Sequence, residues 1–236
     1  ASLEGSPVEL QDVLVQLRED ADTAIPAAKF MPYAERHNLM QAIDKWVIAH
    51  ALPVAISHSK SSRNARFFVR VSSRFLTDPD MLEWLRTLLK SAPTLPEGNL
   101  IFQIPEVYLD KHLRDVKVFI DLLRKAECSL AIAQFGQGRN SLGVLDHLKV
   151  EFIKLKDDLV AGMNNDEKKR QRVEALVEKA KSRNIETIAQ RVESADTIAL
   201  LWQMGVQYIQ GNYLQEPGAI IEHNAPLSGK LKYGAR

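Results

Sequence analysis

Cysteine is almost absent from the 236-residue sequence, which contains only Cys128. A single cysteine excludes an intrachain disulfide, and we expect a buried, unreactive thiol in a reducing compartment. None of the six histidines pairs with another histidine or with the cysteine at the spacing of metal ligands. No apolar run approaches the roughly 20 residues of a membrane-spanning helix, and no signal peptide is recognisable, so we expect no direct membrane span.

An excess of charge is also lacking, because 31 lysine and arginine residues face 30 aspartate and glutamate residues. The net charge of +1 gives no sign of nucleic-acid or membrane binding, so any anion site has to be local. A glycine-rich phosphate loop is missing as well. Residues 136–138, Gly-Gln-Gly, are followed by no third glycine in register, which argues against a dinucleotide fingerprint.

The sequence does contain a regular alternation of short apolar runs with longer amphipathic stretches. The runs predict strands at 65–72, 99–104, 129–135, 150–155, 185–190 and 206–209. The stretches between them predict helices at 78–90, 106–126, 166–183 and 194–204, and residues 8–52 are expected to be largely helical, broken at Pro26 and Pro32. This alternation predicts an α/β fold with a parallel sheet, most simply a TIM-type (β/α) barrel, with a doubly wound open sheet as the alternative.

Polar residues follow the predicted strands, at the edge where barrels carry their functional groups. They are Arg70, Ser72, Gln103, Gln134, Lys154, Lys156, Gln190, Glu193 and Gln210. Glu193 is the one acid among them, whereas a site for Mg²⁺ or Mn²⁺ needs several carboxylates. The chemistry of this set predicts a site for an anion.

Eight motifs between about residue 23 and residue 217 resemble, in order, those of the EAL domain family. They are PAAKFMPYAE (26–35), AIDKWV (42–47), VRVSSR (69–74), FQIPE (102–106), AIAQFGQGRNSL (131–142), IKLK (153–156), AQRVE (189–193) and GVQYIQGNYLQEP (205–217). The resemblance implies the modified TIM barrel of that family over residues 1–236, with a C-terminal extension at 218–236. The Glu-Ala-Leu signature strand is expected before residue 1.

The departures from the family pattern fall on the metal ligands. The family has asparagine at Arg70, glutamate at Gln103 and Gln190, two aspartates at Ala133-Gln134, and aspartate at Lys156, whereas Lys154, Glu193 and Gln210 match. With those carboxylates gone, the resemblance implies no metal cofactor, no catalytic residue and no phosphodiesterase activity. Without metals, Lys154 is alternatively a relic packed against Gln103.

The resemblance to degenerate members of the family implies that the ligand is cyclic di-GMP. The ligand-binding residues it implies are Pro32, Asp44, Arg70, Gln134, Lys154, Gln190, Arg191, Glu193, Gln210 and Gly211. Asp44 would accept from a guanine edge, Pro32 would pack on a base, and Arg70 would bind phosphate or guanine. Three readings without a ligand stay open: Asp44 as a surface or capping carboxylate, Pro32 as a helix breaker, and Arg70 as the ion-pair partner of Glu193 or Glu106.

The same resemblance implies a PilZ-type adaptor protein as partner, a degenerate GGDEF domain upstream in the full-length chain, no nucleic acid, and a cytoplasmic bacterial location, with the cell pole as one option. The function it implies is a nucleotide receptor in type IV pilus assembly and twitching motility. Two alternatives are a phosphodiesterase that uses one non-standard metal, and a scaffold that binds only protein. Trp46, Trp84 and Trp202 lie on helical stripes and are expected in the core.

Overall fold

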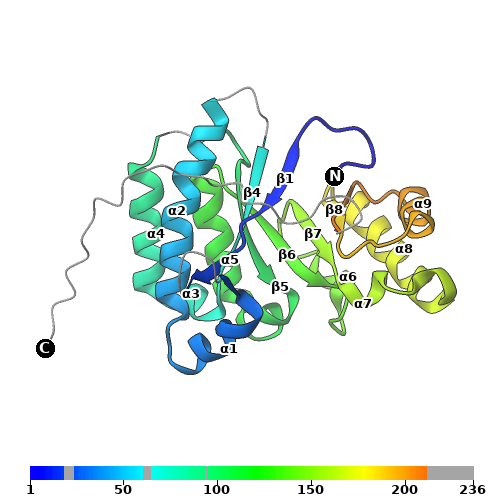
Figure 1. The fold of residues 1–236 in the computed structure, drawn as a ribbon, viewed down its shortest axis with the longest axis horizontal. Coiled ribbons are helices and arrows are strands. Elements are labelled where there is room, and N and C mark those ends of the chain that lie inside the picture. Colours follow the sequence, from blue (N-terminus) through cyan, green and yellow to red (C-terminus); the bar gives the residue numbers. More distant parts are fainter. Residues whose placement is uncertain (19–23, 61–64, 94, 212–236) are drawn as a thin grey trace, which may run out of the picture.

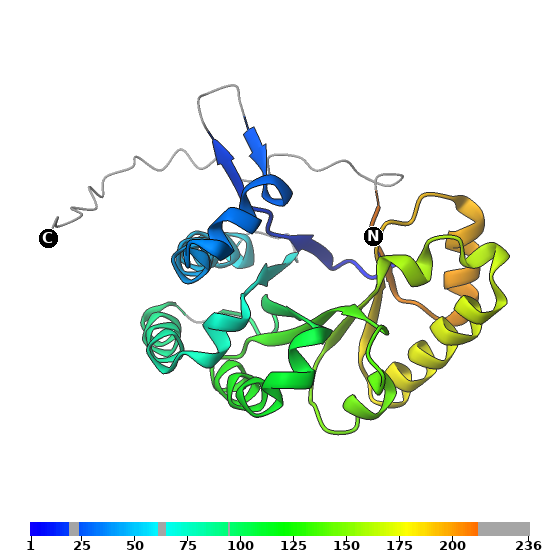
Figure 2. The same cartoon turned by 90° about the horizontal axis from the view of Figure 1, so that it is seen from below.

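The computed structural model describes residues 1–18, 24–60, 65–93 and 95–211. The extension expected at 218–236 and the end of the 205–217 motif lie outside these ranges. The fold is a strongly curved parallel sheet with helices on its outer face (Figures 1 and 2), which confirms the expected α/β barrel class. Within the described ranges, no helix is both long and apolar enough to cross a membrane.

The strands of the curved sheet run in the order β1-β4-β5-β6-β7-β8-β9, and each neighbouring pair is parallel. Their bounds are β1 Glu9–Asp12, β4 Ala65–Arg70, β5 Leu100–Pro105, β6 Ser129–Phe135, β7 Phe152–Leu155, β8 Glu186–Ala189 and β9 Tyr208–Ile209. Residues 1–3 run antiparallel to β9, where the Ala1 ammonium donates to the carbonyl of Ile209 at 2.7 Å. The chain start therefore lies beside the last strand.

Helices follow the strands around the outside of the sheet (Figure 2). Their bounds are α1 Ala27–Arg36, α2 Met40–Lys60, α3 Ser73–Thr77, α4 Pro79–Ser91, α5 Leu109–Lys125, α6 Ser141–Val144, α7 Asp157–Val160, α8 Glu167–Ser182 and α9 Ala195–Met204, with 3-10 turns at Glu106–Tyr108 and Met163–Asn165. The predicted cap of α4 is present, because Asp78 accepts from the Asp80 amide at 2.9 Å and Pro79 stands at the first helical position.

The expectation of a largely helical segment at 8–52 is wrong for its first part. Strand β1 lies there, followed by an antiparallel pair, β2 Gln16–Arg18 and β3 Ala24–Pro26. Val8, Glu9, Leu10 and Gln11 alternate apolar and polar side chains, which is the period of a strand. Pro26 does precede a helix, but Pro32 lies inside α1 and does not break it.

Two apolar clusters form the core. The larger lies between sheet and helices, and the smaller fills the concave side with Phe68, Ile101, Ala131, Phe152, Ile188 and Tyr208. Cys128 is buried, as expected, and burial raises the pKa of its thiol to about 12, so the thiol stays protonated at neutral pH. The tryptophan prediction is wrong for Trp46 and Trp202, which are 54% and 61% exposed.

Candidate functional site

The polar strand ends come together at one edge of the sheet, which we call the mouth. Parallel pairing sets this arrangement, since Arg70 on β4 stands opposite Gln103 on β5, and Lys154 on β7 stands opposite Ile188 on β8. Side chains from six consecutive strands of one curved sheet therefore converge on one region. Its two sides differ in burial and in charge pairing.

The first side is a buried cluster of Asp12, Gln103 and Lys154. The Lys154 ammonium is hydrogen-bonded to Asp12 Oδ1, which also accepts from Gln103 Nε2 at 3.3 Å. Lys154 is 1% exposed, and its Nζ lies 3.9 Å from the centroid of the Phe68 ring. Lys154 is thus a charge removed from water and held by one carboxylate and one aromatic face.

Burial lowers the pKa of the Lys154 ammonium, and the nearby Arg70 guanidinium lowers it further. The charge of Asp12 and its hydrogen bond oppose this lowering. The cluster therefore depends on Asp12 to hold a cation in the interior. Packing of Lys154 against Gln103 was the alternative interpretation. In the structure the two side chains share a hydrogen-bond partner, Asp12.

Asp12 is a residue of the candidate site that was not predicted from the sequence. It lies at the end of β1, inside the segment that was expected to be helical. The sequence does contain a local indication of this residue. Asp12 ends a short alternation of apolar and polar residues and is followed directly by Val13 and Leu14. The triplet Asp12-Val13-Leu14 has the acid, small apolar and leucine order of a Glu-Ala-Leu signature.

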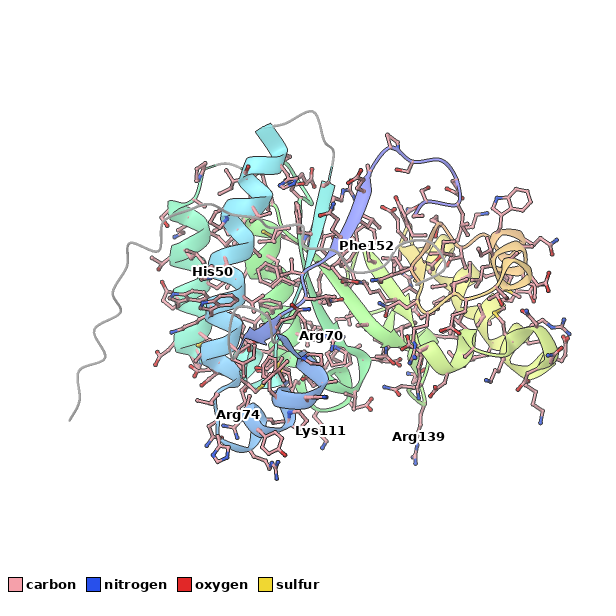
Figure 3. The ribbon with its side chains drawn as sticks, viewed as in Figure 1. His50, Arg70, Arg74, Lys111, Arg139 and Phe152 are labelled. Carbon is pink, nitrogen blue, oxygen red and sulfur yellow. The ribbon has the colours of Figure 1, made fainter. Side chains whose placement is uncertain are left out.

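Arg70 ends β4 as an exposed side chain. Among the described residues it has no ion pair, so the alternative pairing with Glu193 or Glu106 is not found. Figure 3 shows Arg70 near the middle of the molecule, toward the end where β4 and β5 finish. Its guanidinium is available to an incoming ligand.

Glu106 holds the loop after β6. Its Oε2 accepts from the backbone amides of Gly136, Gln137 and Gly138 at 3.0, 3.0 and 2.9 Å. A Cβ at Gly138 would lie 2.9 Å from Glu106 Oε1, which is too close for an alanine without a shift. Gly138 therefore makes room for the buried Glu106 carboxylate and does not indicate a phosphate-binding loop.

Asp44 lies on α2 and is 4% exposed. Its Oδ2 accepts from the hydroxyl and the amide of Ser72 at 2.6 and 3.2 Å. Burial raises the pKa of the Asp44 carboxyl to about 6, and the two bonds from Ser72 oppose this rise. The surface reading of Asp44 is therefore wrong, and its carboxylate already has one partner residue.

The second side of the mouth is an open rim formed by Gln190, Arg191, Glu193, Gln210 and Gly211. Together with Asp157 these residues line a pocket of about 180 Å³. Gln190 Nε2 donates to Gln210 Oε1 at 2.9 Å across the strand ends. A Cβ at Gly211 would collide with the backbone oxygen of Val192, so only glycine fits there.

Two side chains at the rim leave their strands from a left-handed backbone. Gln134 has a φ of 53° and Arg191 a φ of 54°, a conformation that costs a non-glycine residue about 1–2 kcal/mol. Both side chains reach Asp157: Gln134 Nε2 lies 3.4 Å from Oδ1, and an Arg191 guanidinium nitrogen 3.9 Å from Oδ2. Sequence analysis predicted Gln134 and Arg191 but not the carboxylate that joins them.

The remaining predicted residues lie near the mouth in different settings. Lys156, on the β7 side, pairs with Asp158 at 3.2 Å, and Ala133 is buried in the sheet. Pro32 is exposed on α1. In the part of the chain that the structure describes, no group of three or more His, Cys, Asp or Glu side chains is placed to hold a metal ion.

Comparisons with known proteins agree with this architecture. The profile of the EAL domain family matches residues 2–217. The crystal structure of the FimX EAL domain of Pseudomonas aeruginosa bound to c-di-GMP is 34% identical, with a TM-score of 0.83 over 92% of this chain and 87% of that one. The Xanthomonas citri FimX EAL domain in complex with c-di-GMP is 26% identical, with a TM-score of 0.82 over 90% of this chain and 83% of that one.

Among curated relatives, the chain is 27% identical to the cyclic di-GMP phosphodiesterase PdeB of Shewanella oneidensis over 220 residues. That match covers 93% of this chain and 26% of the relative. The chain thus spans under a third of the length of the curated relatives it matches first. Those relatives carry further segments beyond the part that they share with this chain.

Proposed function

This chain belongs to the EAL domain family, and we propose that it is a receptor that binds cyclic di-GMP without hydrolysing it. The observation that carries the proposal is the buried cluster, where Lys154 is neutralised by Asp12 and hydrogen-bonded to nothing else among the described residues. The Lys154 ammonium thus occupies the position next to the Asp12 carboxylate where a metal ion would have to bind.

The residues present at the mouth do not fit a pair of divalent cations. Hard cations prefer several carboxylate oxygens, whereas four of the strand-end positions carry the amides Gln103 and Gln134 and the cations Arg70 and Lys156. Of the carboxylates at the mouth, Asp157 and Asp158 lie within ion-pair distance of Arg191 and Lys156. Asp12 is already bonded to Lys154. We infer that Asp12 stands at the position of the signature acid, so that the signature strand expected before residue 1 is β1, and that the domain lacks a metal-activated water.

Binding does not require the metals if the chain itself compensates the charge of the phosphates. Arg70 supports this, because it is exposed and its guanidinium can form two parallel bonds to a phosphate or to guanine. Asp44 supports recognition of a guanine edge, which would compete for the carboxylate now bonded to Ser72. Related EAL domains have been solved with c-di-GMP bound.

We propose a FimX-like role in type IV pilus assembly and twitching motility, with a PilZ-type adaptor as partner and a degenerate GGDEF domain upstream in the full-length protein. The α1–α2 segment supports a protein contact, because Tyr33 on α1, Leu39 between the helices and Trp46 on α2 are 60%, 52% and 54% exposed. The same apolar surface favours the second candidate, a scaffold that binds protein and no nucleotide. A LapD-like receptor would use the domain in the same way.

The deciding experiment is titration calorimetry of cyclic di-GMP into the domain without divalent metal, followed by chromatography after incubation with Mn²⁺. Binding with intact nucleotide after incubation is the expected result. Linear product would overturn the receptor proposal in favour of a phosphodiesterase. Absence of heat with a folded domain would leave the scaffold.

A further inference from the structure

Asp157 occupies a special position at the mouth. It is the first residue of α7, two positions after the end of β7, which lies between β6 and β8 in the sheet, and its side chain is 27% exposed. It lines the rim pocket and contacts Gln134 and Arg191, which both have a left-handed backbone. Each strained residue brings a polar side chain to this one carboxylate, so the local structure is arranged around a negative charge.

The charges of the mouth are closely balanced. Its cations are Arg70, Lys154, Lys156 and Arg191, and its carboxylates are Asp12, Asp157, Asp158 and Glu193. Three of the four cations have a carboxylate partner within this chain, and Arg70 has none among the described residues. The mouth can therefore compensate little negative charge beyond what Arg70 takes.

This balance bears on which guanine dinucleotide the mouth accepts. A cyclic dinucleotide carries two phosphodiesters with one charge each. Its ring-opened form, produced by hydrolysis of one phosphodiester, keeps one phosphodiester and carries a terminal phosphate with about −1.5 to −2 charges at neutral pH. The linear form thus brings an additional negative charge of about one unit to a mouth whose rim already contains Asp157.

We propose that Asp157 is a specificity-determining residue, whose carboxylate fixes Arg191 and Gln134 and repels the terminal phosphate of linear dinucleotides. The proposal rests on the receptor function above and adds to it the selection of the ring-closed ligand. A receptor with this rim responds more weakly to the linear product of cyclic di-GMP hydrolysis than to the cyclic form. Coulomb repulsion over several ångströms in a partly solvated site predicts roughly three- to tenfold discrimination from this one charge.

The test is titration calorimetry with cyclic di-GMP and with linear 5′-phosphoguanylyl-guanosine, on the wild type and on Asp157→Asn. Asparagine keeps the volume and can still accept from Gln134 while it removes the charge. We expect the wild type to prefer the cyclic form and the variant to gain roughly three- to tenfold in affinity for the linear form relative to the cyclic one. Asp121→Asn removes the same charge from an exposed position on α5 and should leave the ratio of affinities unchanged.

An unchanged ratio in Asp157→Asn, with cyclic di-GMP still bound, would overturn this inference and leave the receptor function intact. A gain that also occurs in Asp121→Asn would overturn it too, because it would reflect the net charge of the protein alone. If the wild type binds neither nucleotide, the receptor function fails first and this inference with it. Circular dichroism of both variants checks that they are folded.

Discussion

The buried cluster and the open rim lie at the same edge of one parallel sheet, but their ion pairs differ in burial. In the cluster, Lys154 is 1% exposed and its partner Asp12 is fixed by the fold. At the rim, the Arg191 side chain is 71% exposed and lies 3.9 Å from Asp157, close enough to interact and free enough to move. Burial thus makes one pair part of the stability of the protein and leaves the other to respond to ligands.

The largest effect is expected from breaking the buried pair. Asp12→Ala should lower the free energy of unfolding by about 3–5 kcal/mol, because it leaves the Lys154 charge in the interior without a partner. Urea denaturation measures it. The double variant Asp12→Leu with Lys154→Met should recover most of the loss, since apolar residues of similar volume often replace a buried pair at no cost. Gln190→Ala on the rim should change stability by less than about 0.5 kcal/mol.

Arg70 belongs to neither pair, which makes it the sharpest test of ligand binding. Arg70→Ala should weaken cyclic di-GMP binding by about 1–3 kcal/mol, roughly a five- to 150-fold loss of affinity. Arg74→Ala removes an exposed cation from α3, four residues along the chain, and serves as the matched control. Calorimetry measures both affinities. If the two variants lose the same affinity for cyclic di-GMP, Arg70 acts only through its long-range charge and makes no direct contact.

Asp44 predicts a pH dependence of binding. Its folded-state pKa of about 6 lies above the ordinary value, so the carboxylate that we propose accepts from guanine becomes protonated as the pH falls through about 6. The affinity should fall about tenfold between pH 7.5 and pH 5, because only the ionised fraction is competent. Calorimetry at the two pH values checks this, and Asp44→Asn should bind weakly with little pH dependence.

The raised pKa of Asp44 affects the stability of the fold in the direction opposite to its effect on ligand binding. Above pH 6 the folded protein keeps a buried carboxylate that is solvated in the unfolded chain, so Asp44 lowers stability there. The folded state takes up a proton below about 6 and the unfolded state only near its ordinary pKa of 3.8, so this cost is relieved as the pH falls. Relative to Asp44→Asn, the wild type should therefore become more stable between pH 7 and pH 5. A constant difference would argue against the raised pKa.

The smallest expected effect separates strain from function at the rim. Arg191→Gly and Arg191→Ala both remove the guanidinium, but only glycine relieves the left-handed backbone. The glycine variant should be more stable than the alanine variant by about 0.5–1 kcal/mol, the strain less the greater freedom of glycine in the unfolded chain. Urea denaturation of the pair measures the difference, and a more stable alanine variant would contradict it.

Much of the fold could be predicted from local patterns. The run at 129–135 coincides with β6, and the capped stretch at 78–90 lies within one residue of α4. Strand β1 was missed because Leu10 is the one apolar residue among its four, whereas the equally short β7 has three. A strand with a single apolar position shows no apolar run, and its place is set by pairing with β4, far along the chain.

The sequence by itself determined which chemical groups stand at the strand ends: amides and cations where a metal site needs carboxylates. It also determined the family, through motifs whose order survives over most of the chain. Only the tertiary structure decided which of these groups meet. Asp12 and Lys154 are 142 positions apart, and Asp157 reaches Arg191 only because β7 and β8 are neighbours. Burial and pairing are properties of the packed sheet, and they decide which charges stabilise the protein and which remain for a ligand.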